Sequence, residues 1–334
     1  MTGNLLTVST SPHILGRTSL RSMYLEMMIA LVPALITGLY FFGAPGLITV
    51  LLAVASAAAT EYLISLILKK PSTLGNLHVL LMGLLIGLIL PPGAPWWLPL
   101  VGGFLTVALG MTVFGGNGNY PMNPVLVAWA AMALSWPEAM NAYLEPVALG
   151  SGDDWMEAET FLIQLKGDIG ALEMFELGNL WLGKTAGAIG ATGTWALLAG
   201  GLYLVIRRLI PWQVPLGALI GAIGMGLVAV YTDERVAEMG FEEFGAYMNI
   251  VWLHLGAGGF MIAAFFLAPE PVSSPVTPWG GFLFGLGVGL MTIIVRFWGS
   301  PVEGAFYGVL LMNAATPLLD RIRPRVIGKV VSGA

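Results

Sequence analysis

Long apolar runs separated by short polar segments dominate the sequence. An apolar helix needs about 20 residues, within a range of roughly 17 to 25, to cross the hydrocarbon core of a bilayer. Two runs, 77–91 and 124–136, are short and bounded by prolines, so we expect them to be tilted, broken or dipping segments. The pattern predicts an all-α polytopic membrane protein with about ten transmembrane helices. The ten runs are 23–42, 46–68, 77–91, 96–114, 124–136, 191–206, 213–231, 250–268, 280–298 and 303–319.

The ten predicted helices form two sets of five, which makes the sets antiparallel, as in transporters built from inverted repeats. Residues 103–105 and 281–283 share one tripeptide, and Pro91 and Pro269 match at the same offset of 178 residues. The segments that follow these prolines are then equivalent interruptions of the helical structure in the two repeats. They either line the functional site or are ordinary turns at the membrane interface. The predicted organisation is a tail 1–22, a first five-helix repeat 23–136, an acidic insert with a glycine-rich segment 137–190, a second five-helix repeat 191–319 and a basic tail 320–334.

Composition supports the membrane assignment and removes several kinds of chemistry. Of the 334 residues, 57% are hydrophobic and 10% are charged, whereas soluble domains usually carry about 25% charged residues. The net charge of -5 offers no basic surface, so we predict no nucleic-acid partner. The chain has no cysteine, which excludes thiolate metal sites and iron–sulfur clusters ligated by this chain. We assign no metal ligand and no catalytic side chain.

The cations predict the orientation in the membrane. With ten helices and both termini on the cytoplasmic side, ten of the fourteen Lys and Arg residues fall on that side, as the positive-inside rule requires. The acids do the reverse, because fourteen of the nineteen lie in the outer segments 137–180 and 232–249. The cytoplasmic cations are Arg17, Arg21, Lys69, Lys70, Arg207, Arg208, Arg321, Arg323, Arg325 and Lys329.

A glycine-rich segment, 183–194, lies on the outer side of this topology. Its end contains Gly190, Ala191, Thr192, Gly193 and Thr194. Small residues let a flat ligand or another backbone approach closely, and the free N–H groups where the next helix begins favour a phosphate. The residues alone leave two interpretations open, an anion site or a glycine-rich packing face with Thr192 as a helix N-cap.

The same five residues resemble the GAT-x-T end of the flavinylation motif that ApbE-type flavin transferases read when they esterify the phosphate of FMN to the threonine. Ile189 stands where this motif usually has serine. Most of the chain is similar to one family, the RnfD subunit of the Rnf electron-transport complex with its relative NqrB. The start of the first apolar run near residue 23 favours RnfD, because NqrB-type chains usually carry a long N-terminal extension. The similar segments are 11–19, 90–97, 114–124, 269–277 and 317–328.

This resemblance implies that FMN is held by a phosphoester to Thr192 on the outer side of a bacterial or archaeal inner membrane. It also implies a function within an ion-translocating ferredoxin:NAD oxidoreductase, in which electron flow drives Na⁺ or H⁺ across the membrane. The implied partners are a second flavinylated subunit, iron–sulfur subunits and, for maturation, a flavin transferase. The loops 115–124 and 269–277 are possible supports for a second, non-covalent flavin such as riboflavin.

Charged side chains inside the apolar runs are costly and are functional candidates by default. Glu61 lies well inside the second run and is either part of an ion relay or the partner of an inter-helix hydrogen bond. Glu270, in the proline-rich break where the family usually has aspartate, is the other candidate for an ion path. Glu26 is expected to reach the inner interface, and Arg296 either steadies an anionic flavin or anchors its helix at the outer interface.

Two further interpretations remain open at this level. His78 and His254 enter their helices from opposite sides, so paired haem ligation is not expected. A transporter built on the same inverted repeat without a redox cofactor is one alternative function, and a structural anchor for redox partners is another. Thr192 discriminates among them, because neither alternative needs a flavinylation motif at the outer face.

Overall fold

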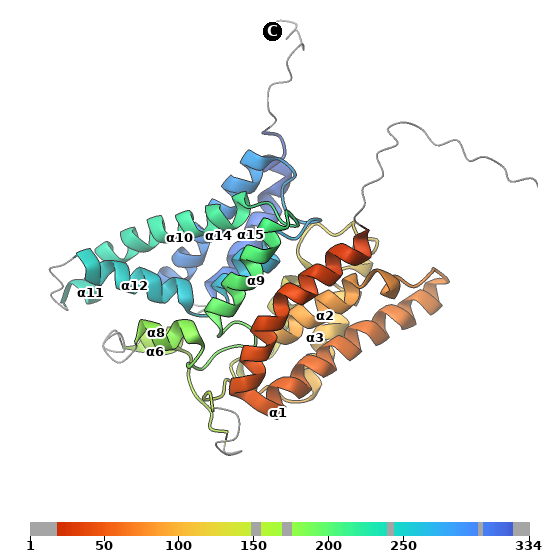
Figure 1. Ribbon diagram of the computed structural model, residues 1–334, viewed down its shortest axis with the longest axis horizontal. Helices are drawn as coiled ribbons and strands as arrows, with labels where there is room; N and C mark the ends of the chain where they lie inside the picture. The colour runs from red at the N-terminus through yellow and green to blue at the C-terminus, as the bar shows by residue number, and fades with distance from the viewer. Residues whose placement is uncertain (1–18, 148–154, 169–175, 239–243, 300–302, 323–334) are drawn as a thin grey trace, which may run out of the picture.

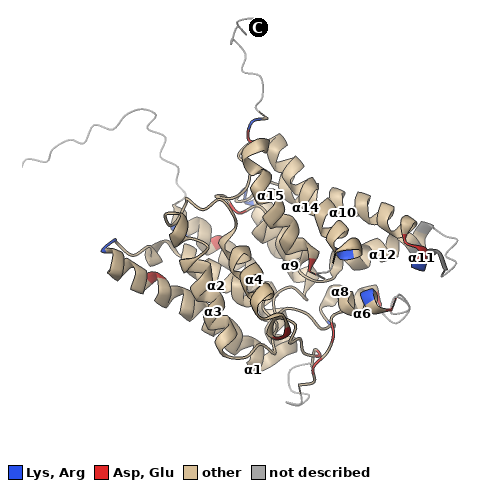
Figure 2. Ribbon diagram, turned by 180° about the vertical axis from the view of Figure 1, so that it is seen from behind, with Lys and Arg blue, Asp and Glu red and all other residues tan. Residues whose placement is uncertain are grey.

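The computed structural model describes residues 19–147, 155–168, 176–238, 244–299 and 303–322 (Figure 1). The family-like residues 11–18 and 323–328, the cations Arg17, Arg323, Arg325 and Lys329, and parts of the acidic insert lie outside these ranges. Within the described ranges the regular elements are helices, and the β-type pairing is one isolated bridge between Leu144 and Glu157. Charged residues are sparse along the helices and lie mostly at helix ends and in connections (Figure 2).

The first half of the chain begins with α1, Leu20–Leu68, which is too long for one crossing. Its 49 residues correspond to roughly 74 Å of helix, more than twice the thickness of a hydrocarbon core. Gly43 breaks the helix with a φ of 50° and a ψ of -133°, and the chain turns back there (Figure 1). The break falls between the predicted runs 23–42 and 46–68. The elements that follow are η1 (Leu74–Asn76), α2 (His78–Ile89), α3 (Trp97–Ala108), η2 (Thr112–Phe114) and α4 (Pro124–Ser135).

Short helices occupy the described part of the acidic insert, and a second set of apolar helices follows. The short helices are α5 (Pro137–Met140), α6 (Phe161–Gly167) and α8 (Leu177–Leu182). The second set contains α9 (Thr194–Ile206), α10 (Gln213–Thr232), α11 (Glu234–Glu238), α12 (Phe244–Gly256), α13 (Phe260–Ile262), the π-helical turn η3 (Ala263–Leu267), α14 (Pro278–Trp298) and α15 (Gly304–Leu319).

Four described helices are long and apolar enough to cross a membrane, namely α1, α3 extended to Phe114, α10 and α14. A fifth crossing is obtained if Tyr247–Gly256 and Phe260–Leu267, which are bent by 67°, form one broken span. The helices α2, α4, α9 and α15 are apolar but shorter. Each of the ten predicted runs thus contains a helix, whereas ten complete crossings and the inverted repeat stay predictions.

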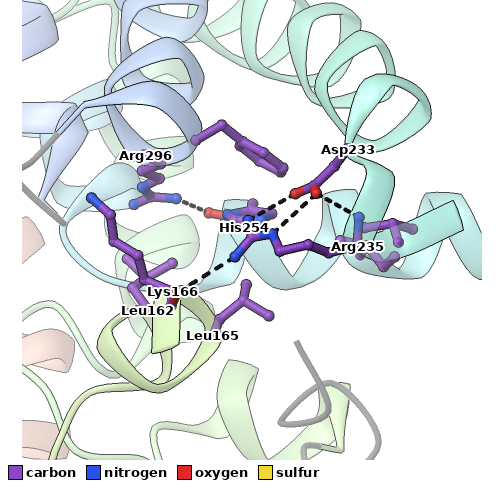
Figure 3. Close-up of a pocket in the computed structure, with 10 residues that line it drawn as sticks. Leu162, Leu165, Lys166, Asp233, Arg235, His254 and Arg296 are labelled. Carbon is purple, nitrogen blue, oxygen red and sulfur yellow. Dashed lines mark hydrogen bonds and ion pairs between the residues drawn. The ribbon is translucent and has the colours of Figure 1, made fainter. Parts of the chain in front are cut away.

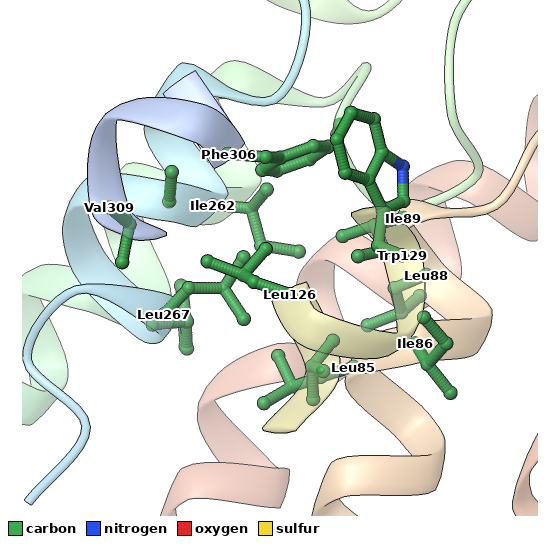
Figure 4. Close-up of a cluster of buried hydrophobic side chains, with 14 of the residues drawn as sticks. Leu85, Ile86, Leu88, Ile89, Leu126, Trp129, Ile262, Leu267, Phe306 and Val309 are labelled. Carbon is green, nitrogen blue, oxygen red and sulfur yellow. The ribbon is translucent and has the colours of Figure 1, made fainter. Parts of the chain in front are cut away.

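The two halves meet through an apolar cluster between α2 and α4 on one side and α13, η3 and α15 on the other (Figure 4). Trp129 packs edge-on against Phe306 with ring centroids 4.8 Å apart, a favoured aromatic geometry. Close packing is the main attraction between helices in lipid, because lipid tails are as apolar as the side chains. The labelled members are Leu85, Ile86, Leu88, Ile89, Leu126, Trp129, Ile262, Leu267, Phe306 and Val309.

Helices α10 and α14 approach each other so closely that glycines are needed at the contact. A Cβ added at Gly217 or Gly221 would collide with the backbone of α14, and one at Gly285 or Gly289 would collide with the backbone of α10. Each pair is spaced four residues apart, which is the small-xxx-small pattern of membrane helix packing. Gly224 of α10, in contrast, has no atom within 4 Å of an added Cβ.

We predict that Gly221→Ala destabilises the protein by about 1–3 kcal/mol, because the new methyl overpacks the contact with Leu286. The matched variant Gly224→Ala should be neutral or slightly stabilising, since alanine is the better helix former by roughly 0.8–1.0 kcal/mol. Thermal unfolding of the detergent-solubilised variants measures both effects. Equal stability of the two variants would show that α10 and α14 do not pack through these glycines.

Candidate functional site

The glycine-rich segment bridges the two halves of the molecule. The chain leaves α8 at Gly183, whose φ of 89° is left-handed, and enters α9 at Thr194 with Gly193 as the N-cap. Between them, Ile189 N donates to Leu90 O at 3.2 Å and Gly190 N donates to Leu88 O at 2.7 Å. These bonds satisfy carbonyl groups that the end of α2 leaves without helical partners. The segment that starts the second half therefore caps a helix of the first half.

Thr192 is buried, and its hydroxyl Oγ1 has no hydrogen-bond partner among the described residues. Burying a hydroxyl without a partner costs free energy, so an unpartnered hydroxyl in a native structure calls for an explanation. The neighbouring hydroxyl of Thr194 is satisfied, because it donates to Gly256 O at 3.0 Å. The two threonines of the motif are thus chemically distinct, and Thr192 is the one with a free oxygen.

Thr192 helps to line a cavity whose other walls are small residues together with Phe161, Leu162 and Leu180. The cavity measures about 10 Å³, which has room for a water-sized group only. A Cβ at Gly187 would lie 2.8 Å from the Thr192 methyl group, so glycine is needed there. The lining residues are Thr160, Phe161, Leu162, Leu180, Thr185, Ala186, Gly187, Ala188, Ala191, Thr192, Gly256, Ala257 and Gly258.

Ile189, which replaces the usual serine of the motif, packs away from this cavity. It is fully buried, its backbone carbonyl lies against Gly38 of α1, and its side chain is 3.7 Å from a Cβ built at Gly46. An isoleucine there fills the space beside the bend of α1. The substitution therefore leaves the surroundings of Thr192 unchanged and contributes to packing instead.

The other wall of the cavity is the break between α12 and α13, which two charged side chains stabilise. Arg296 of α14 donates through Nη2 to Ala257 O at 2.8 Å and through Nη1 to His254 O. Glu303 accepts a hydrogen bond from Gly259 N at 3.0 Å, and Gly258 takes a left-handed φ of 60°. A cation thus meets the carbonyl end of one helix and an anion meets the amide end of the next, as the helix dipoles favour. Because Arg296 is buried, the prediction that it anchors an interface is wrong.

A second small cavity, about 30 Å³ in volume, shares Leu162 with the Thr192 cavity (Figure 3). Lys166, Arg235, His254 and Arg296 contribute to its lining, and Arg235 pairs with Asp233 at 2.8 Å. The hydrogen bonds from Arg235 lower the pKa of the Asp233 carboxyl. Burial, and to a smaller extent the charge of Arg235, lowers the pKa of the Lys166 ammonium. The lining of this cavity therefore carries three cationic side chains and one carboxylate, that of Asp233.

An aromatic cavity of about 460 Å³ adjoins the same region. Its walls include Trp129, Tyr143 and Tyr307, and Thr160 lines both this cavity and that of Thr192. Burial raises the pKa of the Tyr143 phenol, with a smaller effect of Glu303, so this hydroxyl stays protonated. Its size and aromatic lining are typical of cavities for flat organic ligands. No sequence motif marks these residues, and sequence reasoning missed them.

Glu61 and Glu26 of α1 lie apart from the glycine-rich segment and have local partners. Glu61 Oε1 accepts hydrogen bonds from Thr73 N at 3.1 Å and Thr73 Oγ1 at 2.5 Å, and it lines a cavity of about 320 Å³. Glu26 pairs with Arg207 at the end of α9, with N and O atoms 2.7 Å apart. This ion pair ties α1 to α9 where both helices carry their predicted cytoplasmic cations.

Glu270 is buried after η3 and accepts hydrogen bonds from Tyr120, Val272 and Ser273. His78 contacts Tyr120 in the same region, whereas the ring of His254 packs against Phe297. The two histidines thus have separate surroundings, and the structure does not bring them together. Glu270 and His78, which the sequence treats separately, lie in one network.

The fold and the site define a polytopic membrane protein in which a glycine-rich loop and a broken helix enclose a buried threonine, whose hydroxyl has no hydrogen-bond partner among the described residues. The chain belongs to the NQR2, RnfD, RnfE family, whose model matches residues 7–328.

Three relatives illustrate the similarity, and each is the D component of its complex. The one from the Na(+)-translocating ferredoxin:NAD(+) oxidoreductase complex of Acetobacterium woodii is 37% identical, over 97% of this chain and 95% of that protein. The one from the proton-translocating ferredoxin:NAD(+) oxidoreductase complex of Clostridium ljungdahlii is 32% identical, over 95% and 94%. The one from the ion-translocating oxidoreductase complex of Stutzerimonas stutzeri is 32% identical, also over 95% and 94%.

We predict that Arg296→Gln destabilises the protein by about 2 kcal/mol or more, because buried carbonyls at the helix break lose charged donors. The matched variant Arg235→Gln removes an arginine from the same cavity. It should cost less than about 1 kcal/mol, because its ion pair is partly exposed. Thermal unfolding in detergent compares the two. A smaller loss for Arg296→Gln than for Arg235→Gln would contradict the assigned role of Arg296.

Proposed function

We propose that the chain is the D-type membrane subunit of an ion-translocating ferredoxin:NAD oxidoreductase, and that it carries FMN on Thr192 through a phosphoester. Membership of the family and the names of the relatives support the complex. The observation that carries the flavin is the buried Thr192 hydroxyl without a hydrogen-bond partner among the described residues, in a residue that lines a small cavity. A covalently attached phosphate explains why this oxygen is left free while that of Thr194 is bonded.

The residues around Thr192 have the chemistry that a phosphate needs, and the loop must open to admit one because the cavity holds only a water-sized group. Gly190, Ala191 and Gly193 keep the backbone free of side-chain bulk, and Thr194 starts a helix whose amide end favours negative charge. Thr194 also fixes this turn, because its hydroxyl is bonded to Gly256 across the cavity. When bound, the flavin supplies one- and two-electron chemistry, while the protein supplies position and exclusion of water.

The aromatic cavity is the place on the chain that suits the flavin ring. Its volume of about 460 Å³ lies within the usual range for sites of small organic ligands. Trp129 and Tyr307 offer aromatic faces, and Tyr143 offers a protonated phenol. The shared residue Thr160 makes the two cavities neighbours. A second, non-covalent flavin such as riboflavin would bind in the cavity beside Glu61. Gly115, Gly116 and Asn117 also line this cavity.

The proposal also includes the orientation of the chain in the membrane and the other subunits of the complex. Both termini lie in the cytoplasm and Thr192 faces the outside of an inner membrane, in agreement with the distribution of cations along the sequence. A flavin transferase attaches the FMN there. Because the chain has no cysteine, iron–sulfur subunits must hold the clusters, and a second flavinylated subunit exchanges electrons with this one. Glu61 and Glu270 are the candidates for an ion path.

We predict that the chain, co-expressed with a flavin transferase, is fluorescent on a denaturing gel and that Thr192→Ala abolishes this fluorescence. Thr194→Ala removes a neighbouring hydroxyl that is already bonded and should retain it. Ile189→Ser should also retain it, because Ile189 faces α1. A non-fluorescent parent chain would refute covalent attachment, and a fluorescent Thr192→Ala variant would move it elsewhere.

For the ion path, we predict that Glu61→Gln lowers the number of ions translocated per electron while electron transfer continues. Glutamine keeps an oxygen that can accept from Thr73, so the variant removes the charge and preserves the fold. Glu26→Gln is the control, since Glu26 pairs with Arg207 at the protein surface. Ion uptake into proteoliposomes with the reconstituted complex measures the ratio. Unchanged coupling in Glu61→Gln would remove Glu61 from the path.

A further inference from the structure

Three buried side chains connect the two halves of the molecule by hydrogen bonds. The Tyr120 hydroxyl donates to Glu270 Oε1 at 2.7 Å, and its oxygen lies 3.0 Å from Nε2 of His78. His78 is the first residue of α2, Tyr120 precedes α4, and Glu270 follows η3. Each side chain is at most 3% exposed. The contact therefore joins both halves inside the protein.

The number of hydrogens fixes the direction of these bonds. Tyrosine has one hydroxyl hydrogen, so when Tyr120 donates to an ionised Glu270, its oxygen must accept from Nε2–H of His78. When Glu270 is protonated, its O–H donates to Tyr120, and Tyr120 donates to a bare Nε2. The two arrangements differ by one proton moved from the Glu270 carboxyl to the His78 ring through the Tyr120 hydroxyl. No atom or charge is gained or lost in this transfer.

The chain of hydrogen bonds has one open end. His78 Nδ1 is buried and has no hydrogen-bond partner among the described residues, although Nε2 is bonded. Nδ1 is the terminal atom of this chain, and a proton can enter or leave there only when a further donor or acceptor reaches it. By the predicted topology, this end belongs to the cytoplasmic side, because His78 begins α2 shortly after Lys69 and Lys70.

The surroundings of Glu270 suit a proton rather than a metal cation. One carboxylate oxygen accepts from Tyr120, and the other accepts from Val272 N, Ser273 N and Ser273 Oγ. A carboxylate has about two lone-pair sites on each oxygen, so the three donors saturate Oε2 and Oε1 keeps one free site beside Tyr120. A sodium ion needs oxygen ligands with free lone pairs, whereas the atoms around this carboxylate are donors.

Glu270 also determines the packing of the segment after η3. Three hydrogen bonds from Val272 and Ser273 to Glu270 hold this turn. The backbone carbonyl of Ser273 accepts hydrogen bonds from Asn313 Nδ2 and Thr316 Oγ1 of α15. Asn313 Oδ1 in turn accepts from Asn123 N, at the start of α4. Protonation of Glu270 weakens its bonds to the turn, because a neutral carboxyl is a poorer acceptor. Hydrogen bonds thus connect the turn that Glu270 holds to α15 and to the start of α4.

We propose that His78, Tyr120 and Glu270 form an internal proton-transfer chain whose occupancy controls the junction between the two halves of the protein. This inference rests on the proposed ion-translocating function, and it names the proton as the species that this part of the chain handles. The further titratable group that faces the three residues within the described structure is Tyr24 of α1, whose ring centroid lies 4.7 Å from that of His78. The side chains of α15 that contact this network are the neutral Asn313 and Thr316, which donate hydrogen bonds to the Ser273 carbonyl.

The test compares Tyr120→Phe, which deletes only the central hydroxyl, with Tyr24→Phe, which deletes a hydroxyl on the ring packed beside His78. Each variant is measured as the complete complex in proteoliposomes, first for ions translocated per electron and then for electron transfer with the gradient collapsed by an ionophore. We expect Tyr120→Phe to slow proton transfer along this chain about tenfold or more, because a positioned proton-transfer group contributes typically 10²–10⁴-fold to a rate, and so to lower the number of ions translocated per electron. Electron transfer with ionophore and Tyr24→Phe should match the parent.

Infrared difference spectra over a pH titration of the same complex give a second measurement that does not depend on activity. The carboxylic acid band that disappears in Glu270→Gln should shift to higher frequency in Tyr120→Phe, which removes its hydrogen-bond partner, and stay in place in Tyr24→Phe. If Tyr120→Phe does not accumulate, His78→Gln keeps the Tyr120–Glu270 bond but cannot accept a proton, and it should lose coupling equally.

Normal coupling or an unshifted band in Tyr120→Phe, or normal coupling in His78→Gln, would overturn the proton-transfer chain. Flavin fluorescence on a denaturing gel is recorded for every variant. Its absence from the parent would count against the proposed flavin site alone, since the infrared measurement follows Glu270 whether or not FMN is attached.

Discussion

The structure depends on one constraint: backbone groups exposed where a helix ends in the membrane need a partner, because hydrocarbon offers none. The helix α2 ends after Ile89, and the glycine-rich segment supplies N–H groups to its carbonyls. The break between α12 and α13 is closed by Arg296 and Glu303. The turn after η3 is closed by Glu270. The bonds from the glycine-rich segment to α2 join the two halves, whereas the other two closures stabilise breaks within the second half.

This constraint explains why most intramembrane charges of the chain are not free. Arg296, Glu303 and Glu270 each bind backbone groups at a break, which gives every one of them a structural function. Thr192 differs, because it lies at such a junction and its hydroxyl has no partner among the described residues. An unpartnered buried hydroxyl in a native structure calls for an explanation, and the proposed phosphoester on Thr192 supplies one.

The sequence predicted local features well. The apolar runs locate the helices, Gly43 falls between two predicted runs, and the glycine-rich segment lies directly before α9. Family resemblance was confirmed by the match over residues 7–328. These features depend on nearest neighbours and on periodicity, which a single sequence records.

Long-range pairs were not predictable in the same way. Nothing in the sequence indicates that Tyr120 meets Glu270, 150 residues away, or that Arg296 binds carbonyls of α12 rather than the membrane interface. The aromatic cavity was missed because Trp129, Tyr143 and Tyr307 come from separate elements. Such contacts arise only once helices pack, and hydropathy contains no information on which faces meet.

The most direct measurement of the central claim is peptide mapping of the mature protein by mass spectrometry. Cleavage after Lys184 and Arg207 releases residues 185–207, which contain Thr185, Thr192 and Thr194. We predict that this peptide carries one FMN and that fragment ions place it on Thr192. An unmodified peptide from protein matured with a flavin transferase, or an FMN on Thr185 or Thr194, would contradict the assignment.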